Sequence, residues 1–363
     1  MRIRTRHLLG ALAITAATAL CATACSSSQA ATSSSSDSGD PLAAAKEFYQ
    51  GKTITFIVGN AAGSGPATAM SLLKGPMEKY LGATINMTFS SAAPIVSEDQ
   101  VGTAPPDGLT IGELSLGGAL LAVYSGAGTP SFDLTQASFM GAVVQVPDLL
   151  VACANSPIKT LDDLASGKYP VSMVSQKLGQ NGLVANYLLN IFDVQNPTWN
   201  FYSNTADQTT GCARGDGNLN VGNAVNSTDA AGTNMTPGIT PLMVLGSVEG
   251  FPSENALKDV PTLEEWAAEN PPKTAKGKQA LELLQAMFTE NSPSWVVFGP
   301  PGMDDGYRQF IADAMRSAMA DPEVKEKFIA ATTPTQYVTP EDVKASITAQ
   351  LGDNTDVIKA FLP

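Results

Sequence analysis

The stretch best suited to chemistry is "GNAAGSGPATAM" (residues 59–70), which directly follows the β-branched, apolar run "KTITFIV" (residues 52–58). Glycines and small side chains leave its backbone N–H groups exposed. A glycine-rich turn between a strand and a helix is a standard place to hold an anion, because donors converge there and the helix macrodipole adds positive potential. No Gly-Lys-Ser/Thr follows, and Thr68 stands where G-x-G-x-x-G needs its third glycine, so nucleotide phosphate is disfavoured. A tight turn without a ligand is the alternative.

Histidine chemistry is almost excluded. The only histidine, His7, lies in an N-terminal segment that reads as a removable signal. Without it there is no Ser-His-Asp or Cys-His catalysis and no His-ligated zinc or iron. Ser64 lies between two glycines but lacks a base partner, and no Gly-x-Ser-x-Gly elbow is present. We therefore expect no catalytic residue, no metal and no cofactor, with an exported α/β enzyme as the alternative.

Two cysteines, Cys153 and Cys212, lie in the body of the chain. In an exported protein such a pair favours a disulfide over a metal site or a nucleophile, and two thiols alone cannot complete a zinc shell. Buried free thiols are the alternative.

The N-terminus resembles a bacterial lipoprotein signal. Three arginines precede the apolar stretch Leu8 to Leu20, and "ATAC" ends at Cys25, where cleavage and acylation would follow. Cys21 is the weaker candidate because a leucine precedes it. We expect residues 1–24 to be a signal peptide, with a plain signal or an uncleaved anchor as alternatives.

Composition sets further bounds. The 363 residues are 44% hydrophobic and 15% charged, and no later apolar run is long enough to cross a bilayer. The formal charge of −13 becomes −16 once residues 1–24 are removed, which argues against nucleic acid or anionic lipid as partners. Residues 25–40 are serine-rich and predict a flexible tether.

From Pro41 onward, strand-like and helix-like segments alternate, with short glycine-bearing turns between them. This pattern predicts an α/β class with parallel sheets. We expect strands at 53–58, 83–89, 109–116, 139–146, 148–155, 169–175, 219–225 and 240–248, and helices at 41–51, 67–81, 181–192, 307–320 and 340–351. Pro76 should kink or split the helix at 67–81.

Five short motifs share an order along the chain: "AAGSG" (61–65), "APPDGLTI" (104–111), "KDVPTLEEW" (258–266), "SWVVFGPPG" (294–302) and "ADPEVKEKF" (320–328). In this order they resemble the substrate-binding proteins of the tripartite tricarboxylate transporter family, also called Bug-type extracytoplasmic solute receptors. The resemblance covers nearly all of Gly51 to Pro363.

The resemblance implies a two-lobed, periplasmic-binding-protein-like clamshell (a Venus flytrap), each lobe a mainly parallel sheet flanked by helices. By position, lobe I would be residues 41–148 plus 241–363 and lobe II residues 149–240, so both body cysteines would lie in lobe II. The implied function is extracytoplasmic capture of a small carboxylate in the interlobe cleft and delivery to membrane permease subunits. The protein would act as a membrane-anchored monomer, with a ligand-sensing receptor not coupled to transport as the alternative.

The resemblance also implies the ligand contacts. In the first lobe they are Asn60, Ala61, Ala62, Gly63, Ser64, Thr68 and Ser115. In the second lobe they are Ser175, Gln176, Lys177, Gly179, Gln180, Asn181 and Asn223. For each polar residue the alternative is a helix cap or turn residue that never touches ligand, and this is most serious for Thr68 and Asn223.

Three departures from the family pattern lie near the expected cleft. "FSSAAPIVSED" (89–99) replaces an Arg-Pro-Gly-Ala-Gly-Gly segment, the loop at 175–181 lacks the family's serine run and histidine, and residues 270–291 predict an added helix. Lys177 and Arg214 are the only cations in the expected cleft-side loops. If neither reaches the ligand, neutral donors favour few-charge or aromatic carboxylates over citrate.

Overall fold

The computed structural model describes residues 40–90, 94–126, 128, 130–176, 180–202, 205–229, 232–249, 251–289, 291–331, 334–351 and 358–362. The predicted signal peptide, Cys25 and almost all of the serine-rich tether lie outside these ranges.

One six-stranded sheet forms the centre of what we call the first lobe. Its spatial order is β11-β4-β10-β3-β1-β2. The strands are β1 (Thr53–Val58), β2 (Thr84–Phe89), β3 (Thr110–Ser115), β4 (Ser138–Val144), β10 (Pro293–Gly299) and β11 (Tyr337–Val338). The accompanying helices are α1 (Pro41–Tyr49), α2 (Gly65–Leu81), α3 (Pro94–Gly102), α4 (Leu116–Ser125), the 3-10 turn η1 (Leu134–Gln136), α12 (Asp305–Ala320), α13 (Pro322–Ala330) and α14 (Pro340–Leu351).

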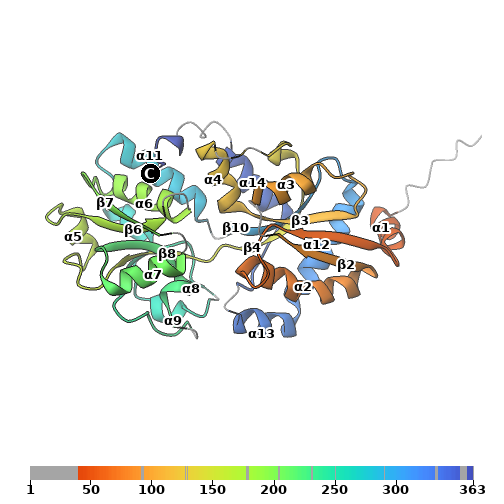
Figure 1. Ribbon diagram of the computed structural model, residues 1–363, viewed down its shortest axis with the longest axis horizontal. Coiled ribbons are helices and arrows are strands. Elements are labelled where there is room, and N and C mark those ends of the chain that lie inside the picture. The colour runs from red at the N-terminus through yellow and green to blue at the C-terminus, as the bar shows by residue number, and fades with distance from the viewer. Residues whose placement is uncertain are drawn as a thin grey trace, which may run out of the picture. The chain divides into compact units, whose positions relative to one another are not determined.

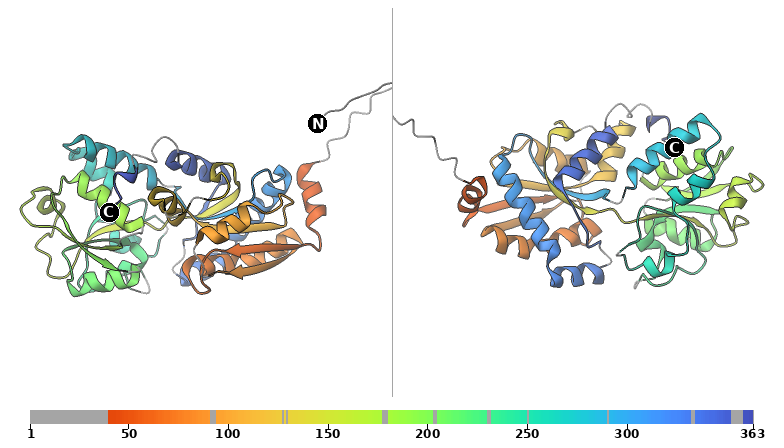
Figure 2. Two further views of the ribbon diagram at one scale, coloured as in Figure 1. Left: turned by 45° about the horizontal axis from the view of Figure 1, so that its top comes forward. Right: turned by 180° about the vertical axis from the view of Figure 1, so that it is seen from behind.

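A five-stranded sheet with the order β7-β6-β8-β5-β9 forms the centre of the second lobe. Its strands are β5 (Asp148–Ala152), β6 (Ser172–Gln176), β7 (Thr198–Tyr202), β8 (Leu219–Asn223) and β9 (Thr240–Leu245). Its helices are α5 (Leu161–Ala165), α6 (Gln180–Ile191), α7 (Thr205–Arg214), α8 (Ala224–Ser227), α9 (Glu254–Leu257), α10 (Leu263–Glu269) and α11 (Ala275–Met287). Helices cover both faces of each sheet (Figures 1 and 2), so the predicted α/β class is confirmed.

The pairing directions correct the expectation of mainly parallel sheets. In the first lobe β1 pairs in parallel with β2 and β3, but β10 runs antiparallel to β3 and β4. In the second lobe β6 pairs in parallel with β7 and β8, but β5 runs antiparallel to β8 and β9. Both sheets are therefore mixed. The antiparallel pairings include β5 and β10, the strands that follow the two passages between the sheets, and also the short β11, which pairs with β4.

The chain passes between the lobes twice, and the two connecting segments lie side by side. Three residues link β4 to β5, and Gln145 N donates to Ser292 O at 2.8 Å, next to the start of β10. Because β9 pairs with β5 and α11 packs against α6, the chain stays with the second sheet well beyond residue 240. The second passage therefore lies near Ser292, beyond the boundary expected at 240/241. Helix α11 is the helix predicted for the added segment.

Helix α2 holds the end of the glycine-rich loop, which leads into it. Its residues Met70, Leu73 and Met77 are fully buried and pack in the core of the first lobe, where α12 lies against α2. The helix runs unbroken through Pro76. The predicted split is thus wrong, because one missing backbone hydrogen bond costs less than this buried face contributes. Among the described residues no helix is long and apolar enough to cross a membrane.

Candidate functional site

The glycine-rich loop lies at the carboxyl end of β1 and leads into α2. Residues 61–63 are exposed, and Ser64 N donates to Ala61 O at 3.1 Å, which closes a turn. Gly63 has φ +85°, a conformation that a side chain would strain. The Ser64 hydroxyl, at the N-cap, is buried and finds no hydrogen-bond partner among the described residues. The loop thus presents exposed backbone and one uncommitted hydroxyl at the N-terminus of a 17-residue helix.

Asn60 and Ser115 meet at the carboxyl ends of the neighbouring strands β1 and β3. Asn60 Nδ2 donates to Ser115 Oγ at 3.1 Å and to Glu113 Oε2 at 2.9 Å. Ser115 Oγ donates to Glu113 Oε1 at 2.7 Å. Asn60 and Ser115 are half-buried, whereas Glu113 is only 2% exposed. The two predicted residues therefore form a polar layer over a buried carboxyl group that the sequence analysis did not predict.

A second buried carboxyl group lies behind Glu113. Glu98, on α3, is also 2% exposed, and both of its oxygens lack a hydrogen-bond partner among the described residues. Burial, together with the neighbouring charges of Glu113 and Asp99, raises the pKa of Glu98 to about 7. Burial likewise raises the pKa of Glu113 to about 7, against the lowering effect of its bonds from Ser115 and Asn60. One buried pair of acids thus titrates near neutral pH beneath the candidate site.

Trp295 connects the strand β10 to the glycine-rich loop. It pairs with Ser115 across β10 and β3, and its ring lies 3.1 Å from the point where a Cβ on Gly65 would be. Gly65 is therefore needed for close contact between the helix start and the indole. Thr68, one turn later, is half-buried, and its N–H donates to Ser64 O at 2.8 Å as part of the helix.

The described second-lobe residues differ in their burial and in their hydrogen-bond partners. Ser175 is fully buried, and its Oγ donates to the carbonyl of Gln176 at 3.4 Å. Gln176 Nε2 donates to Thr205 Oγ1 at 3.3 Å, and Asn181 is 8% exposed. Asn223 caps α8, because its Oδ1 accepts from Asn226 N at 2.9 Å. Lys177 and Gly179 lie outside the described residues.

Gln180 connects the second lobe to the first. Its Oε1 lies 1.8 Å from the point where a Cβ on Gly117 would be, so the side chain rests directly on the backbone at the start of α4. Gly117 is two residues after Ser115. The N-terminus of α6 therefore lies against the N-terminus of α4, beside the Asn60 and Ser115 pair.

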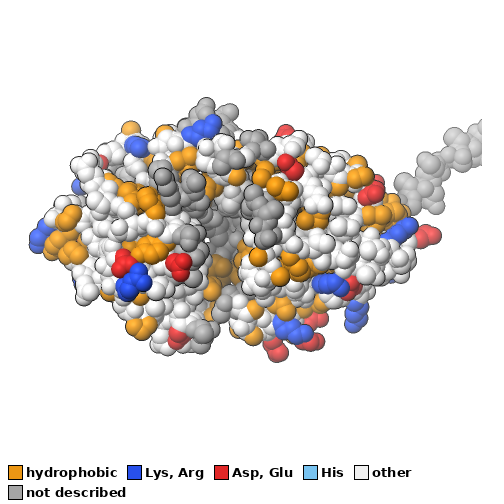
Figure 3. Space-filling model, viewed as in Figure 1, with side chains coloured by type: hydrophobic (Ala, Val, Ile, Leu, Met, Phe, Trp, Pro, Cys, Tyr) orange, Lys and Arg blue, Asp and Glu red, His pale blue; other side chains and the backbone are white. Residues whose placement is uncertain are grey.

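Of the two cations in the expected cleft-side loops, Lys177 lies outside the described residues and Arg214 lies away from the Asn60 and Ser115 pair. Arg214 is at the C-terminal end of α7, whereas Thr205, which contacts Gln176, begins this helix. Arg214 is exposed and pairs with Asp216. Its position excludes it from the Asn60 and Ser115 pair, and none of the ion pairs among the described residues brings another lysine or arginine there. On the face drawn in Figure 3, charges of both signs are scattered, with no continuous basic patch.

Cys153 and Cys212 form a disulfide with an S–S distance of 2.11 Å. It joins the end of β5 to α7 within a buried apolar cluster of the second lobe. The described residues bring together no group of three or more His, Cys, Asp or Glu side chains suited to a metal ion.

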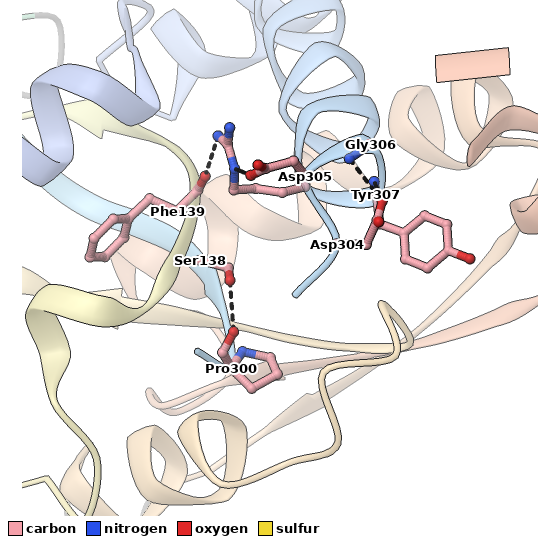
Figure 4. A network of polar contacts seen from close by, with 8 residues as sticks. Ser138, Phe139, Pro300, Asp304, Asp305, Gly306 and Tyr307 are labelled. Atoms are coloured by element: carbon pink, nitrogen blue, oxygen red, sulfur yellow. Dashed lines mark hydrogen bonds and ion pairs between the residues drawn. The ribbon is translucent and has the colours of Figure 1, made fainter. Parts of the chain in front are cut away.

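A separate cavity of about 390 Å³ lies between η1, β4 and the starts of α12 and α14. Because β10 is antiparallel to β3, this cavity lies at the opposite edge of the first sheet from Ser115. Its polar groups serve the fold: Ser138 Oγ donates to Pro300 O at 2.7 Å, and Asp304 caps α12 (Figure 4). Arg308 is similarly occupied, donating to Asp305 Oδ1 at 3.3 Å. We therefore place the functional site at the Asn60 and Ser115 edge.

The fold is that of periplasmic binding proteins. The structure of the periplasmic binding protein BugD is 19% identical, with a TM-score of 0.58, covering 86% of this chain and 98% of that one. MatC (Rpa3494) from Rhodopseudomonas palustris with bound malate is 18% identical, with a TM-score of 0.58, covering 85% and 99%. A TctC solute-binding protein from Polaromonas is 15% identical, with a TM-score of 0.66, covering 86% and 98%. The sequence itself matches no protein-family model and no curated protein.

Proposed function

We propose that the protein is an extracytoplasmic solute receptor that captures a small organic acid between its two lobes and delivers it to a permease of the tripartite tricarboxylate type. The observation that carries the proposal is the meeting of loop and helix N-termini at one edge. The glycine-rich loop before α2, Ser115 before α4, and Gln180 at the start of α6 all lie where the strands end. Helix N-termini and exposed backbone N–H groups favour an anion.

The likeness in fold to a malate-bound protein supports the class of ligand. In our proposal the contacts are those named from the sequence: the loop from Asn60 to Ser64 with Thr68 and Ser115, and the second-lobe loop from Ser175 to Asn181 with Asn223. If Lys177 does not reach the ligand, neutral donors hold the carboxylate. In that case we expect few-charge or aromatic carboxylates to bind better than citrate.

A thermal-shift screen tests the ligand class. The purified protein, stripped of co-purified ligand by unfolding and refolding, is screened against mono-, di- and tricarboxylates and aromatic acids, with sugars, amino acids and phosphate as controls. A ligand at a hundred times its Kd stabilises the fold by about 2.7 kcal/mol. A shift confined to one class of carboxylate supports the proposal, whereas shifts only with sugars or amino acids would contradict it.

Two matched glycine variants test the location of the site. Gly63 and Gly51 both have positive φ, +85° and +69°, and both have open space where a Cβ would be. Gly63→Ala and Gly51→Ala therefore carry a similar backbone strain of about 1–2 kcal/mol. Only Gly63→Ala should weaken carboxylate binding, because Gly51 is at the opposite end of β1. If the two variants bind the carboxylate equally well, the glycine-rich loop is not part of the binding site.

The lipid anchor and the transport role need separate tests. We propose that Cys25 is acylated after cleavage, so Cys25→Ala should move the protein from the membrane to the soluble fraction. A protein that stays soluble without this substitution would contradict the anchor. Carboxylate uptake into cells that depends on the receptor would distinguish delivery from a purely sensing role.

A further inference from the structure

The polar hydrogens of Asn60 and Ser115, which lie over Glu113, are already used in hydrogen bonds. Asn60 Nδ2 directs one hydrogen to Glu113 Oε2 and the other to Ser115 Oγ, at 2.9 and 3.1 Å. The single hydrogen of the Ser115 hydroxyl goes to Glu113 Oε1 at 2.7 Å. With Glu113 ionised, this pair can therefore offer a ligand only lone pairs, on Asn60 Oδ1 and Ser115 Oγ. A carboxylate, which accepts hydrogen bonds only, finds no donor in these two side chains.

Among the described residues, the elements that flank Glu113 carry acids and no base close to it. Strands β1 and β10, which flank β3, carry no titratable side chain, and α4 carries only Tyr124. Helix α3, which packs on β3, contributes Glu98 and Asp99. The charged residues of α2 begin only at Lys74, in its second half.

Of the two acids on α3, Asp99 has a donor and Glu98 does not. Asp99 Oδ1 accepts from Ser131 N at 2.6 Å, whereas neither Glu98 oxygen has a partner among the described residues. The two carboxyl groups are each 2% exposed, and neither takes part in an ion pair among the described residues. Burial favours the protonated form of both, and for Glu98 the charges of Glu113 and Asp99 add to this effect, so that the pKa of each group is raised to about 7.

We propose that Glu113 determines whether Ser115 accepts or donates a hydrogen bond at the ligand site, so that capture of a carboxylate takes up one proton from solvent. When Glu113 is protonated, its Oε1–H donates to Ser115 Oγ across the same 2.7 Å contact. Asn60 keeps both of its bonds, because the other oxygen of Glu113 still accepts. The Ser115 hydrogen is then free to turn outward to the ligand. The same proton removes the buried negative charge nearest to these two side chains.

This inference rests on the proposed function and predicts a linkage between pH and affinity. A ligand that binds only the protonated receptor loses about tenfold in affinity for each pH unit above the pKa of Glu113, and its affinity levels off below that pKa. Glu113→Gln imitates the hydrogen-bond pattern of protonated Glu113 at every pH, because its amide can donate to Ser115 while its carbonyl accepts from Asn60. The variant should bind with the low-pH affinity of the wild type at every pH. Glu98→Gln removes the like charge. The pH at which the affinity begins to fall should therefore be lower than in the wild type, but the fall itself should remain.

The experiment is calorimetric titration with malate, adipate and benzoate between pH 6.0 and 8.5. Repeating the pH 7.5 titration in phosphate and in Tris, which differ in ionisation enthalpy, gives the number of protons taken up. We expect a value approaching one for the wild type and near zero for Glu113→Gln. Glu78→Gln is the control, since Glu78 is paired with Lys74 near the far end of α2. It should reproduce the wild-type profile.

Each outcome bears on a different claim. A wild-type affinity that does not vary with pH, or an unchanged pH slope in Glu113→Gln, would overturn the inference and leave the receptor proposal standing. An affinity that rises with pH would mean that the ionised pair accepts hydrogen bonds from a donor on the ligand, which also overturns it. Failure of all three acids to bind at any pH would overturn the receptor proposal itself. Circular dichroism of Glu113→Gln shows whether the variant is folded.

Discussion

The disulfide between Cys153 and Cys212 offers the most direct test of what stabilises the second lobe. It closes a loop with a sequence separation of 59 residues, which contains β6, β7, α5 and α6. Breaking it lets the unfolded chain regain the freedom of that loop. The chain-entropy relation for a loop of this length gives about 4 kcal/mol at 25 °C. This is a large part of the 5–15 kcal/mol that is typical of a folded domain.

The perturbation is the double variant Cys153→Ala with Cys212→Ala, unfolded in urea beside the wild type. Both cysteines are almost fully buried, so alanine also leaves two small cavities. The control is therefore wild-type protein reduced while unfolded and kept in reductant, which retains both sulfurs and loses only the cross-link. Trp199, on β7 in the second lobe, reports the affected transition, and Trp295, on β10 in the first lobe, reports the other.

We expect the reduced wild type to lose about 4 kcal/mol in the transition seen by Trp199, with a smaller change in that seen by Trp295. The double variant should lose slightly more, because of its cavities. If reduced and oxidised protein unfold at the same urea concentration, the entropy argument fails. Other contacts would then already restrain this loop in the unfolded chain.

Two further predictions concern burial in other parts of the chain. Leu73→Ala removes a fully buried side chain from the α2 face and should lower the free energy of unfolding by about 2–5 kcal/mol, measured in urea; a loss below 1 kcal/mol would show that the site collapses around the smaller residue. Asp148 is 4% exposed at the passage between the lobes, and burial raises its pKa from 3.8 to about 7. Because the raised pKa means that the folded state holds this proton more tightly, the stabilisation is complete below pH 3.8 and is lost as the pH rises through 7. The wild type should therefore lose up to about 4 kcal/mol more than Asp148→Asn between acid and pH 8.5, and parallel profiles of Tm against pH would contradict this assignment.

Local patterns predicted much of the secondary structure. Apolar, β-branched runs gave β1, β3 and β5, and the spacing of Leu73, Met77 and Leu81 gave α2, because these segments bury the residues that show the period. Strand β7 and helix α7 were not predicted. Strand β7 is an edge strand without a fully buried position, and α7 is polar, with three threonines. Neither carries an apolar period that could be recognised.

The pairing of the strands could not be predicted in the same way. Strand β10 was not among the predicted strands. It is inserted between β3 and β4 after a long excursion through the second lobe, which its apolar run alone does not indicate. Its antiparallel direction depends on where the chain returns, beside Gln145, and not on any residue within the strand. Propensity and periodicity describe single elements, whereas sheet order is a property of the whole chain.

Only part of the candidate site could be predicted, because residues on different elements come together only through packing. Asn60 and Ser115 follow strands, so a motif resemblance could place both at the sheet edge. Glu113 is one carboxylate in a buried strand, and the sequence signal was only its presence among apolar neighbours. Nothing in the spacing indicates that Glu98, on a different element, lies with it. Only the packing of α3 on β3 makes the two carboxyl groups a pair.

In the proposed function, an acidic protein binds an acid against its own charge. The formal charge of −13 acts at long range, and salt screens it beyond about 8–10 Å, so groups close to the ligand decide affinity. Among the described contacts of Asn60 and Ser115, the only charged partner is Glu113. Changing that one group by one proton therefore alters the site more than any surface acid can. In the proposed function it also supplies a hydroxyl donor at a place where no described lysine or arginine contacts Asn60 or Ser115, and this would favour a ligand with few charges over citrate.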